Sequence, residues 1–299
     1  MKISNNIKGY FFVFIAILAM SNVYIFSKAA LKQVDISKFG VYWFGFALLW
    51  NIIFLFYKKN DLDFNFKYNF KILILLGILE IASTSLFFLA INFFVNPALV
   101  SFLTNIGPVF VTILSIIFLK ERFNKIEILG AVITIFGAFI INYKNGSFFS
   151  KEILLGLFFI LGSKIVSSVS TIITKKNIIG ISPIVFSLNR TIFLFVFAFI
   201  MLLFTSGNFS ISTNILFKIG IGSLLGPFLA AITSYSALKY IDASKSSILG
   251  SAKGLFVLVT AYLYFDILPL TYQIIGGVFT IIGIILITYG KVKIKKSET

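Results

Sequence analysis

Residues 129–143 read LGAVITIFGAFIINY, and residues 275–289 read IGGVFTIIGIILITY. Seven of the fifteen aligned positions are identical, including the pairs Gly130/Gly276, Thr134/Thr280 and Gly137/Gly283. Further identities lie upstream at a spacing of 147 residues, among them Gly9/Gly156, Ser21/Ser168 and Lys28/Lys175. The sequence therefore predicts one structural unit used twice, as a first repeat at residues 1–146 and a second repeat at residues 147–299.

The composition is typical of a protein embedded in lipid. Hydrophobic residues make up 59% of the chain and charged residues 12%, with a mean hydropathy of +1.04, whereas soluble domains carry about 25% charged residues. The chain has no Cys and no His, so it lacks thiolate nucleophiles and the commonest general base and metal ligand. We therefore expect neither an enzyme nor a metal site or cofactor.

Ten apolar runs are long enough to cross a bilayer as helices of about 20 residues, the form that satisfies the backbone hydrogen bonds in hydrocarbon. They lie at residues 9–27, 39–57, 71–92, 97–119, 127–143, 153–174, 183–204, 216–238, 245–265 and 270–290. The first run follows Lys2 and Lys8, as a signal peptide would, but no clear cleavage site follows it and its equivalent recurs near residue 156. We expect it to remain as the first helix.

The net charge of +16 is explained by membrane topology. The lysines lie in short gaps between apolar runs rather than on one face, which argues against nucleic acid as a partner. With the N-terminus inside, the inner segments hold 17 Lys and Arg residues and the outer segments 6. This bias predicts that both termini are cytoplasmic.

Each repeat holds five predicted helices, an odd number, so the second repeat must enter the membrane from the opposite side. The predicted fold is thus an all-α membrane protein with ten transmembrane helices in two inverted five-helix repeats. We expect a multi-pass protein of a bacterial cytoplasmic membrane. In secondary transporters with such repeats, the substrate site lies near the midplane where the halves meet.

Two segments resemble a known family. Asn96–Ile140 and Ala237–Gly283 each contain a helix that ends in an acidic turn, followed by a helix with Gly at seven-residue spacing. They resemble the paired EamA-type domains of the drug/metabolite transporter superfamily. There are departures: Lys253-Gly254 stands where the first repeat has Gly107-Pro108, and the family's Trp-Gly pair is absent around Met20. The resemblance implies gradient-driven movement of small metabolites such as amino acids.

Four charges fall well inside the predicted spans, away from their ends: Glu80, Lys164, Arg190 and Lys253. A charge at the centre of a membrane helix costs about 2.5–3.5 kcal/mol on insertion scales, so it usually faces a cavity or a partner. Glu80 is the single acid among them, and a carboxylate that alternates between water and a dry pocket could carry a proton. The alternative is a structural ion pair with Lys164 or Lys253, and Arg190 could instead extend to the cytoplasmic interface.

Polar side chains form stripes on two predicted helices. Lys164, Ser167, Ser168 and Thr171 share one helix face, as do Ser101, Thr104, Asn105, Pro108 and Thr112. These faces line a cavity, or their hydroxyls bond carbonyls of their own helix. The predicted substrate-binding or coupling residues are Glu80, Thr84, Ser101, Asn105, Lys164, Ser168, Thr171, Ser251 and Lys253, with hinges at Pro108 and Gly254.

Two further features have structural interpretations. The Gly pairs on the repeated stretch allow close helix approach, for internal packing or for a dimer, so both a monomer and a homodimer are open. Glu121, Arg122 and Lys125 form a turn that fixes helix ends and topology.

The leading interpretation is a secondary transporter of small organic solutes in the lipid bilayer, working by alternating access and with proton coupling as an option. No phosphate-binding loop is present, which argues against ATP hydrolysis by this chain. The alternatives are a membrane-embedded enzyme on lipid-linked substrates and a membrane subunit that does not transport.

Overall fold

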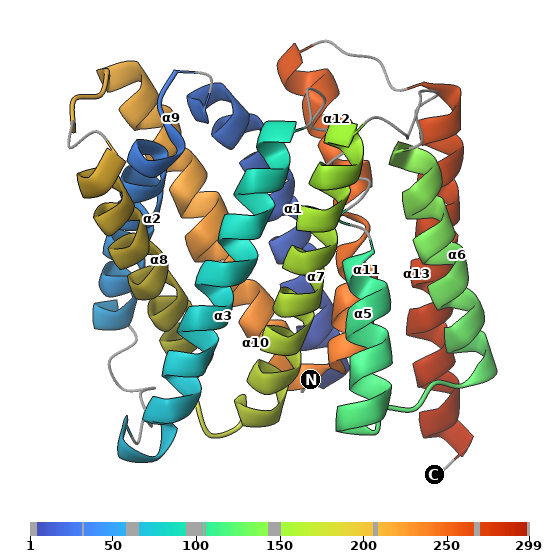
Figure 1. Ribbon diagram of the computed structural model, residues 1–299. Helices are drawn as coiled ribbons and strands as arrows, with labels where there is room; N and C mark the ends of the chain where they lie inside the picture. Colours follow the sequence, from blue (N-terminus) through green and yellow to red (C-terminus); the bar gives the residue numbers. More distant parts are fainter. Residues whose placement is uncertain are drawn as a thin grey trace. The chain divides into compact units, whose positions relative to one another are not determined.

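The computed structural model describes residues 5–31, 33–57, 66–93, 104, 106–142, 151–205, 209–265 and 270–297. Within these ranges every regular element is a helix, and no strand occurs (Figure 1). The first repeat contributes α1 (Asn5–Leu31), α2 (Ile36–Tyr57), α3 (Phe66–Phe93), α5 (Gly107–Leu114), the π-helix η2 (Ser115–Leu119) and α6 (Lys125–Asn142). The second contributes α7 (Lys151–Asn177), α8 (Pro183–Thr205), α9 (Thr213–Ser223), the π-helix η3 (Leu224–Ala230), α10 (Ala231–Tyr240), α11 (Ala243–Gly250), α12 (Lys253–Phe265) and α13 (Thr271–Ser297).

Each of the ten predicted apolar runs overlaps a described helix. Among the described residues, six segments are both long and apolar enough to cross a membrane: Asn5–Val23, Ile36–Tyr57, Asn69–Ala90, Leu155–Asn177, Pro183–Thr205 and Thr213–Tyr240. Two more apolar helices in this part of the chain are shorter, Gly107–Leu119 and Ile274–Ile287. The all-helical fold is thereby confirmed for the described residues, and its apolar helices are consistent with a membrane protein. The count of ten crossings and the inverted repeats stay predictions.

The chain forms two compact units. Unit 1 contains Met1–Phe88 and Ile173–Ile241, and unit 2 contains Leu89–Ile172 and Asp242–Thr299. Each unit thus draws its helices from both sequence repeats. The boundaries of the compact units and those of the repeats are different divisions of the same chain.

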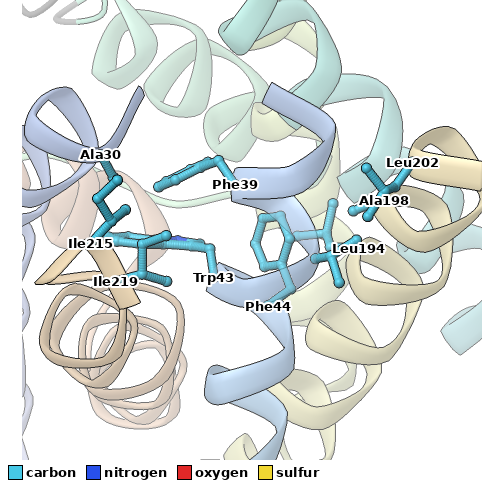
Figure 2. Packing of buried hydrophobic residues seen from close by; sticks show 10 residues of the cluster. Ala30, Phe39, Trp43, Phe44, Leu194, Ala198, Leu202, Ile215 and Ile219 are labelled. Carbon is cyan, nitrogen blue, oxygen red and sulfur yellow. The ribbon is translucent and has the colours of Figure 1, made fainter. Parts of the chain in front are cut away.

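Unit 1 has an apolar core between α2, α8, α9 and the end of α1 (Figure 2). Phe39 and Trp43 of α2 lie at its centre, with ring centroids 4.9 Å apart. At one end of the α2–α8 pair, Ser37 Oγ is 3.1 Å from Thr205 Oγ1, and at the other Asn51 Nδ2 donates to Thr191 Oγ1 at 3.3 Å. Low residue numbers of α2 therefore meet high numbers of α8, so the two helices run antiparallel.

In unit 2 the two copies of the repeated stretch pack against each other as α6 and α13. A Cβ placed on Gly137 would lie 2.5 Å from Thr280 N and 2.6 Å from Gly276 O. A Cβ placed on its equivalent, Gly283, would lie 2.5 Å from Thr134 N and 2.6 Å from Gly130 O. Only Gly allows this backbone approach, and the contacts show that α6 and α13 run antiparallel. The internal-packing interpretation of these glycines is confirmed.

The ninth predicted run is interrupted. α11 ends at Gly250, and α12 begins at Lys253. Across the break the amides of Ser251 and Ala252 bond carbonyls three residues back, at 3.1 Å each. The interruption therefore lies immediately before Gly254, the residue predicted as a hinge.

Candidate functional site

An ion pair between α3 and α8 is the central polar feature of unit 1. Arg190 Nε donates to Glu80 Oε2 at 2.8 Å, and the side chains are 23% and 14% exposed, respectively. Beside it, Asn189 Nδ2 donates to the carbonyl of Leu73 at 2.9 Å and ties α8 to α3 a second time. The pairing explains how both charges are tolerated within apolar helices.

An aromatic residue completes this cluster. Tyr235 of α10 lies within electrostatic range of both Glu80 and Arg190. Its ring centroid is 5.7 Å from that of Phe186, one turn before Arg190 on α8. We refer to Glu80, Arg190 and Tyr235 as the unit 1 cluster.

The structure pairs Glu80 with Arg190, a partner that the sequence interpretation did not name. The guanidinium of Arg190 is thereby held at Glu80, in the middle of α3. A pair of Glu80 with Lys164 or Lys253, and an interfacial position of Arg190, stay predictions. Sequence spacing carries no information on which helices are neighbours, so Tyr235 was missed as well. Thr84 lies one turn beyond Glu80 on α3 and is half-buried.

The hydroxyls of the polar stripe on α7 donate hydrogen bonds to carbonyls of α7 itself. Ser168 Oγ donates to Lys164 O at 2.6 Å, and Thr171 Oγ1 donates to Ser167 O at 2.9 Å. Ser21, the equivalent of Ser168 in the first repeat, likewise donates to its own helix, to Leu18 O at 2.8 Å. The alternative that these hydroxyls bond carbonyls of their own helix is confirmed.

Lys164 lies beside the start of α5 in unit 2. A Cβ placed on Gly107 would come within 3.2 Å of Lys164 Cδ, so the lysine stem packs directly over this glycine. Pro108 is the second residue of α5, a position where its missing N–H costs nothing. Of the other predicted residues on this stripe, Ser101 and Asn105 lie outside the described residues.

The break before α12 holds the remaining predicted residues. Ser251 is 1% exposed and donates its hydroxyl to Ile248 O at 2.6 Å. Lys253 and Gly254 are the first two residues of α12, as Gly107 and Pro108 are of α5. The positions differ by 146 residues, the repeat spacing, so both repeats begin an α-helix at the same place.

A second acidic cluster, which the sequence interpretation missed, lies at the start of α11 in unit 2. Glu121 accepts hydrogen bonds from the amides of Ala243 and Ser244, at 2.7 and 3.1 Å, and from the Ser244 hydroxyl. Lys245 Nζ lies 2.6 Å from Glu127 Oε1 and 3.0 Å from Asp242 Oδ2. The turn around Glu121 does fix helix ends, as predicted. We call these six residues, with Ala243 counted for its amide only, the α11 clamp.

Lys245 was interpreted as a loop lysine, but it is 4% exposed. It lies in α11, outside the six spans named above. Burial alone would lower the pKa of Lys245, but the hydrogen bond to Glu127 and the charge of Asp242 outweigh burial and raise this pKa. The α11 clamp therefore joins the start of α11 to the segment around α6 through charged hydrogen bonds and ion pairs. No group of three or more potential metal ligands occurs among the described residues.

Comparisons with known proteins give a family match, one partial relative and one similar fold. The model of the EamA-like transporter family matches residues 7–143 and again residues 154–289. A WAT1-related protein, At3g28050 of Arabidopsis thaliana, is 33% identical over 131 residues, which cover 41% of this chain and 35% of the plant protein. The match thus spans about a third of that relative. A solved structure described only as "Crystal structure of protein" superposes with a TM-score of 0.80 at 14% identity, covering 94% of this chain and 96% of the other, and shows the same fold.

Proposed function

Because the chain belongs to the EamA-like transporter family, we propose that it is a secondary transporter that moves small organic solutes such as amino acids by alternating access. Family membership makes it an integral multi-pass membrane protein and a transporter rather than an enzyme. The substrate class, the mechanism and any proton coupling belong to the proposal. So do the cytoplasmic membrane as its location and the cytoplasmic position of both termini.

The observation that carries the mechanism is the exchange of equivalent contacts between α6 and α13. Gly137 meets Gly276 and Thr280, while its repeat equivalent Gly283 meets Gly130 and Thr134. Equivalent helices that pack antiparallel through the same residues are what a two-fold axis in the membrane plane produces. A parallel repeat would bring equivalent helices together in the same direction. This exchange supports two inverted repeats.

Contacts at the helix ends support the predicted topology. Lys38 Nζ donates to Ser210 O at 3.0 Å, and both residues fall in loops predicted to be outside. Lys175 Nζ donates to Leu238 O at 2.6 Å, and both residues lie on the predicted inner side. The α11 clamp joins two further inner segments, so all three contacts agree with alternating crossings.

One substrate-contacting region, in unit 2, is proposed near the starts of α5 and α12. Helix starts at corresponding positions of two inverted repeats point to a transporter's binding site, because helix N-termini attract anionic groups there. Lys164 lies over the start of α5, and Lys253 opens α12. Pro108 and Gly254 are the proposed flex points.

Coupling is assigned to Glu80. A carboxylate paired with an arginine inside a span loses that ion pair when it binds a proton. Such a switch gives a transporter a way to link proton movement to a change of conformation. The competing interpretation is that the pair with Arg190 serves the fold alone.

The test is uptake into proteoliposomes of a mixed panel of amino acids and small metabolites, with and without an imposed pH gradient. Wild type is compared with Glu80→Gln and with Asp35→Asn, which removes an exposed carboxylate outside the spans. Thermal unfolding in detergent checks that each variant is folded. We expect saturable uptake of one compound that follows the gradient, disappears in Glu80→Gln and persists in Asp35→Asn.

Two other results would change the assignment. Uptake that ignores both the gradient and Glu80→Gln keeps the transporter but leaves the ion pair a structural role. Lack of saturable uptake across the whole panel contradicts the proposed substrate class.

Because the chain has no Cys, single variants such as Ser210→Cys and Lys239→Cys test the predicted topology. An impermeant maleimide added from outside should label Ser210→Cys and leave Lys239→Cys unlabelled.

A further inference from the structure

The guanidinium at position 190 stands out in this chain. Of its 26 Lys and Arg residues, two are arginines, Arg122 and Arg190. Arg122 is exposed in the connection before α6, whereas Arg190 lies within the span Pro183–Thr205. Arginine differs from lysine in presenting a planar fork of donors that matches a carboxylate in two places at once.

The guanidinium lies deep along the helices. Glu80 is the fifteenth of the 28 residues of α3, which places it about 20 Å from either end at 1.5 Å per residue. Because Arg190 Nε is 2.8 Å from Glu80 Oε2, the guanidinium shares that depth.

Most of the donors of Arg190 are not used by the described part of the chain. Its hydrogen bonding there is limited to Nε with Glu80, whereas a guanidinium carries five N–H donors. The side chain is 23% exposed, and its nitrogens are not among the fully buried side-chain atoms that lack a hydrogen-bond partner in the described part of the chain. Exposed N–H groups cost several kcal/mol each in hydrocarbon, which favours a position of the Nη1–Nη2 edge toward water or toward a bound polar group.

We propose that the Nη edge of Arg190 binds the carboxylate of the transported solute, with Glu80 holding the guanidinium in position through Nε. The solute is then an organic acid or an amino acid, and Tyr235 lies beside the bound group. This inference rests on the proposed transport function and names its substrate class. It adds Arg190, a residue that the sequence interpretation left aside.

The two arginines make a direct experiment possible. A water-soluble arginine reagent, p-hydroxyphenylglyoxal, is applied to the folded full-length protein in detergent, and peptide mass spectrometry follows modification of Arg190 and Arg122 in the same tube. The probes are benzoate and leucine, each compared with its uncharged carboxyl counterpart, benzamide or leucinamide. At a concentration ten times its Kd, a bound carboxylate should slow modification of Arg190 about tenfold, because only the free fraction reacts. Arg122 is the internal control and should react at an unchanged rate.

Several results would overturn the proposal. Arg190 that reacts only after denaturation does not face water. Arg190 that reacts but is protected by neither carboxylate, or equally by the amides, does not recognise this charge. Protection of Arg122 to the same extent means a general effect of the solute on the reagent.

A second variant separates this proposal from the transport function. Arg190→Lys keeps the positive charge but lacks the planar fork, so it should fold and yet lose at least tenfold in carboxylate-dependent thermal stabilisation and in uptake. Uptake of a carboxylate that is unchanged in Arg190→Lys contradicts the site. Protection of Arg190 by carboxylates in a protein that transports none of them keeps the site and rejects the transport function.

Discussion

The buried pair between Lys245 and Glu127 gives the sharpest stability prediction. Lys245 and Glu127 are 4% and 3% exposed at a distance of 2.6 Å, so water screens the pair weakly. Removing one member of such a pair costs about 3–5 kcal/mol, since it leaves the other charge buried and uncompensated. We expect Lys245→Met to cost about 3 kcal/mol, the low end of the range, or a factor of about 100 in the unfolding equilibrium.

The double variant tests the cause. Glu127 Oε2 also accepts the amide of Asn124 at 3.0 Å, as in a capping box, and Gln can make the same bond. Glu127→Gln combined with Lys245→Met therefore removes both charges and keeps the cap. Because no buried charge remains, most of the lost stability should return.

Unfolding by SDS in mixed micelles, followed by far-UV circular dichroism, measures the free energies. The matched control is Lys239→Met, the same substitution at an exposed lysine at the end of α10, and it should change stability by less than about 0.5 kcal/mol. A loss below about 1 kcal/mol in Lys245→Met would refute the reasoning. A double variant as unstable as Lys245→Met would do so too.

Three further predictions follow from described contacts. The pKa of Lys245 is raised in the folded protein above its usual 10.5. The stability that charged Lys245 gives to the fold is therefore complete below pH 10.5 and is lost as pH rises through the folded pKa. The unfolding free energies of wild type and Lys245→Met should converge in that alkaline range. Gly137→Ala should cost about 1–3 kcal/mol, because its Cβ would press on the backbone of α13, whereas Gly220→Ala, with open space around it, should be neutral or stabilising in the same SDS assay. Lys175→Met removes two bonds to carbonyls at the end of α10, those of Leu238 at 2.6 Å and Ile241 at 2.8 Å. It should lower the unfolding free energy by about 2 kcal/mol, with Lys239→Met again as the control.

The repeat was predictable because it is a property of the sequence compared with itself. Gly130, Gly137 and their equivalents were identified without any structure, and their packing role follows from the small-residue rule for membrane helices. The break before Lys253 was partly predictable, since Gly254 was assigned as a hinge. The exact end of α11 at Gly250 was not, because Ser and Ala occur inside helices as readily as between them.

The sequence could not predict which helices are neighbours, and the reason is physical. A membrane helix that is apolar on all sides has no hydrophobic face that points to its neighbour. Lys164 and Lys253 were therefore named as candidate partners of Glu80, and Arg190 was not. Lys245 illustrates a related problem, because a lysine that contributes to topology and a lysine in a buried pair look identical in sequence.

The polar groups nevertheless fall into two kinds when their partners are compared. Lys175 and Lys245 lie at helix ends and are engaged by carbonyls or carboxylates of adjoining helices, which is what stabilisation requires. Arg190 lies at mid-depth, makes one hydrogen bond through Nε to Glu80, and keeps an accessible edge. The unsatisfied N–H donors of Arg190 add nothing to the stability of the fold at that depth. Satisfying them with protein acceptors, or replacing the arginine by an apolar residue, would cost less free energy than leaving them unpaired. A solute that binds there satisfies those donors, and the cost to the empty protein then becomes part of the affinity for its substrate.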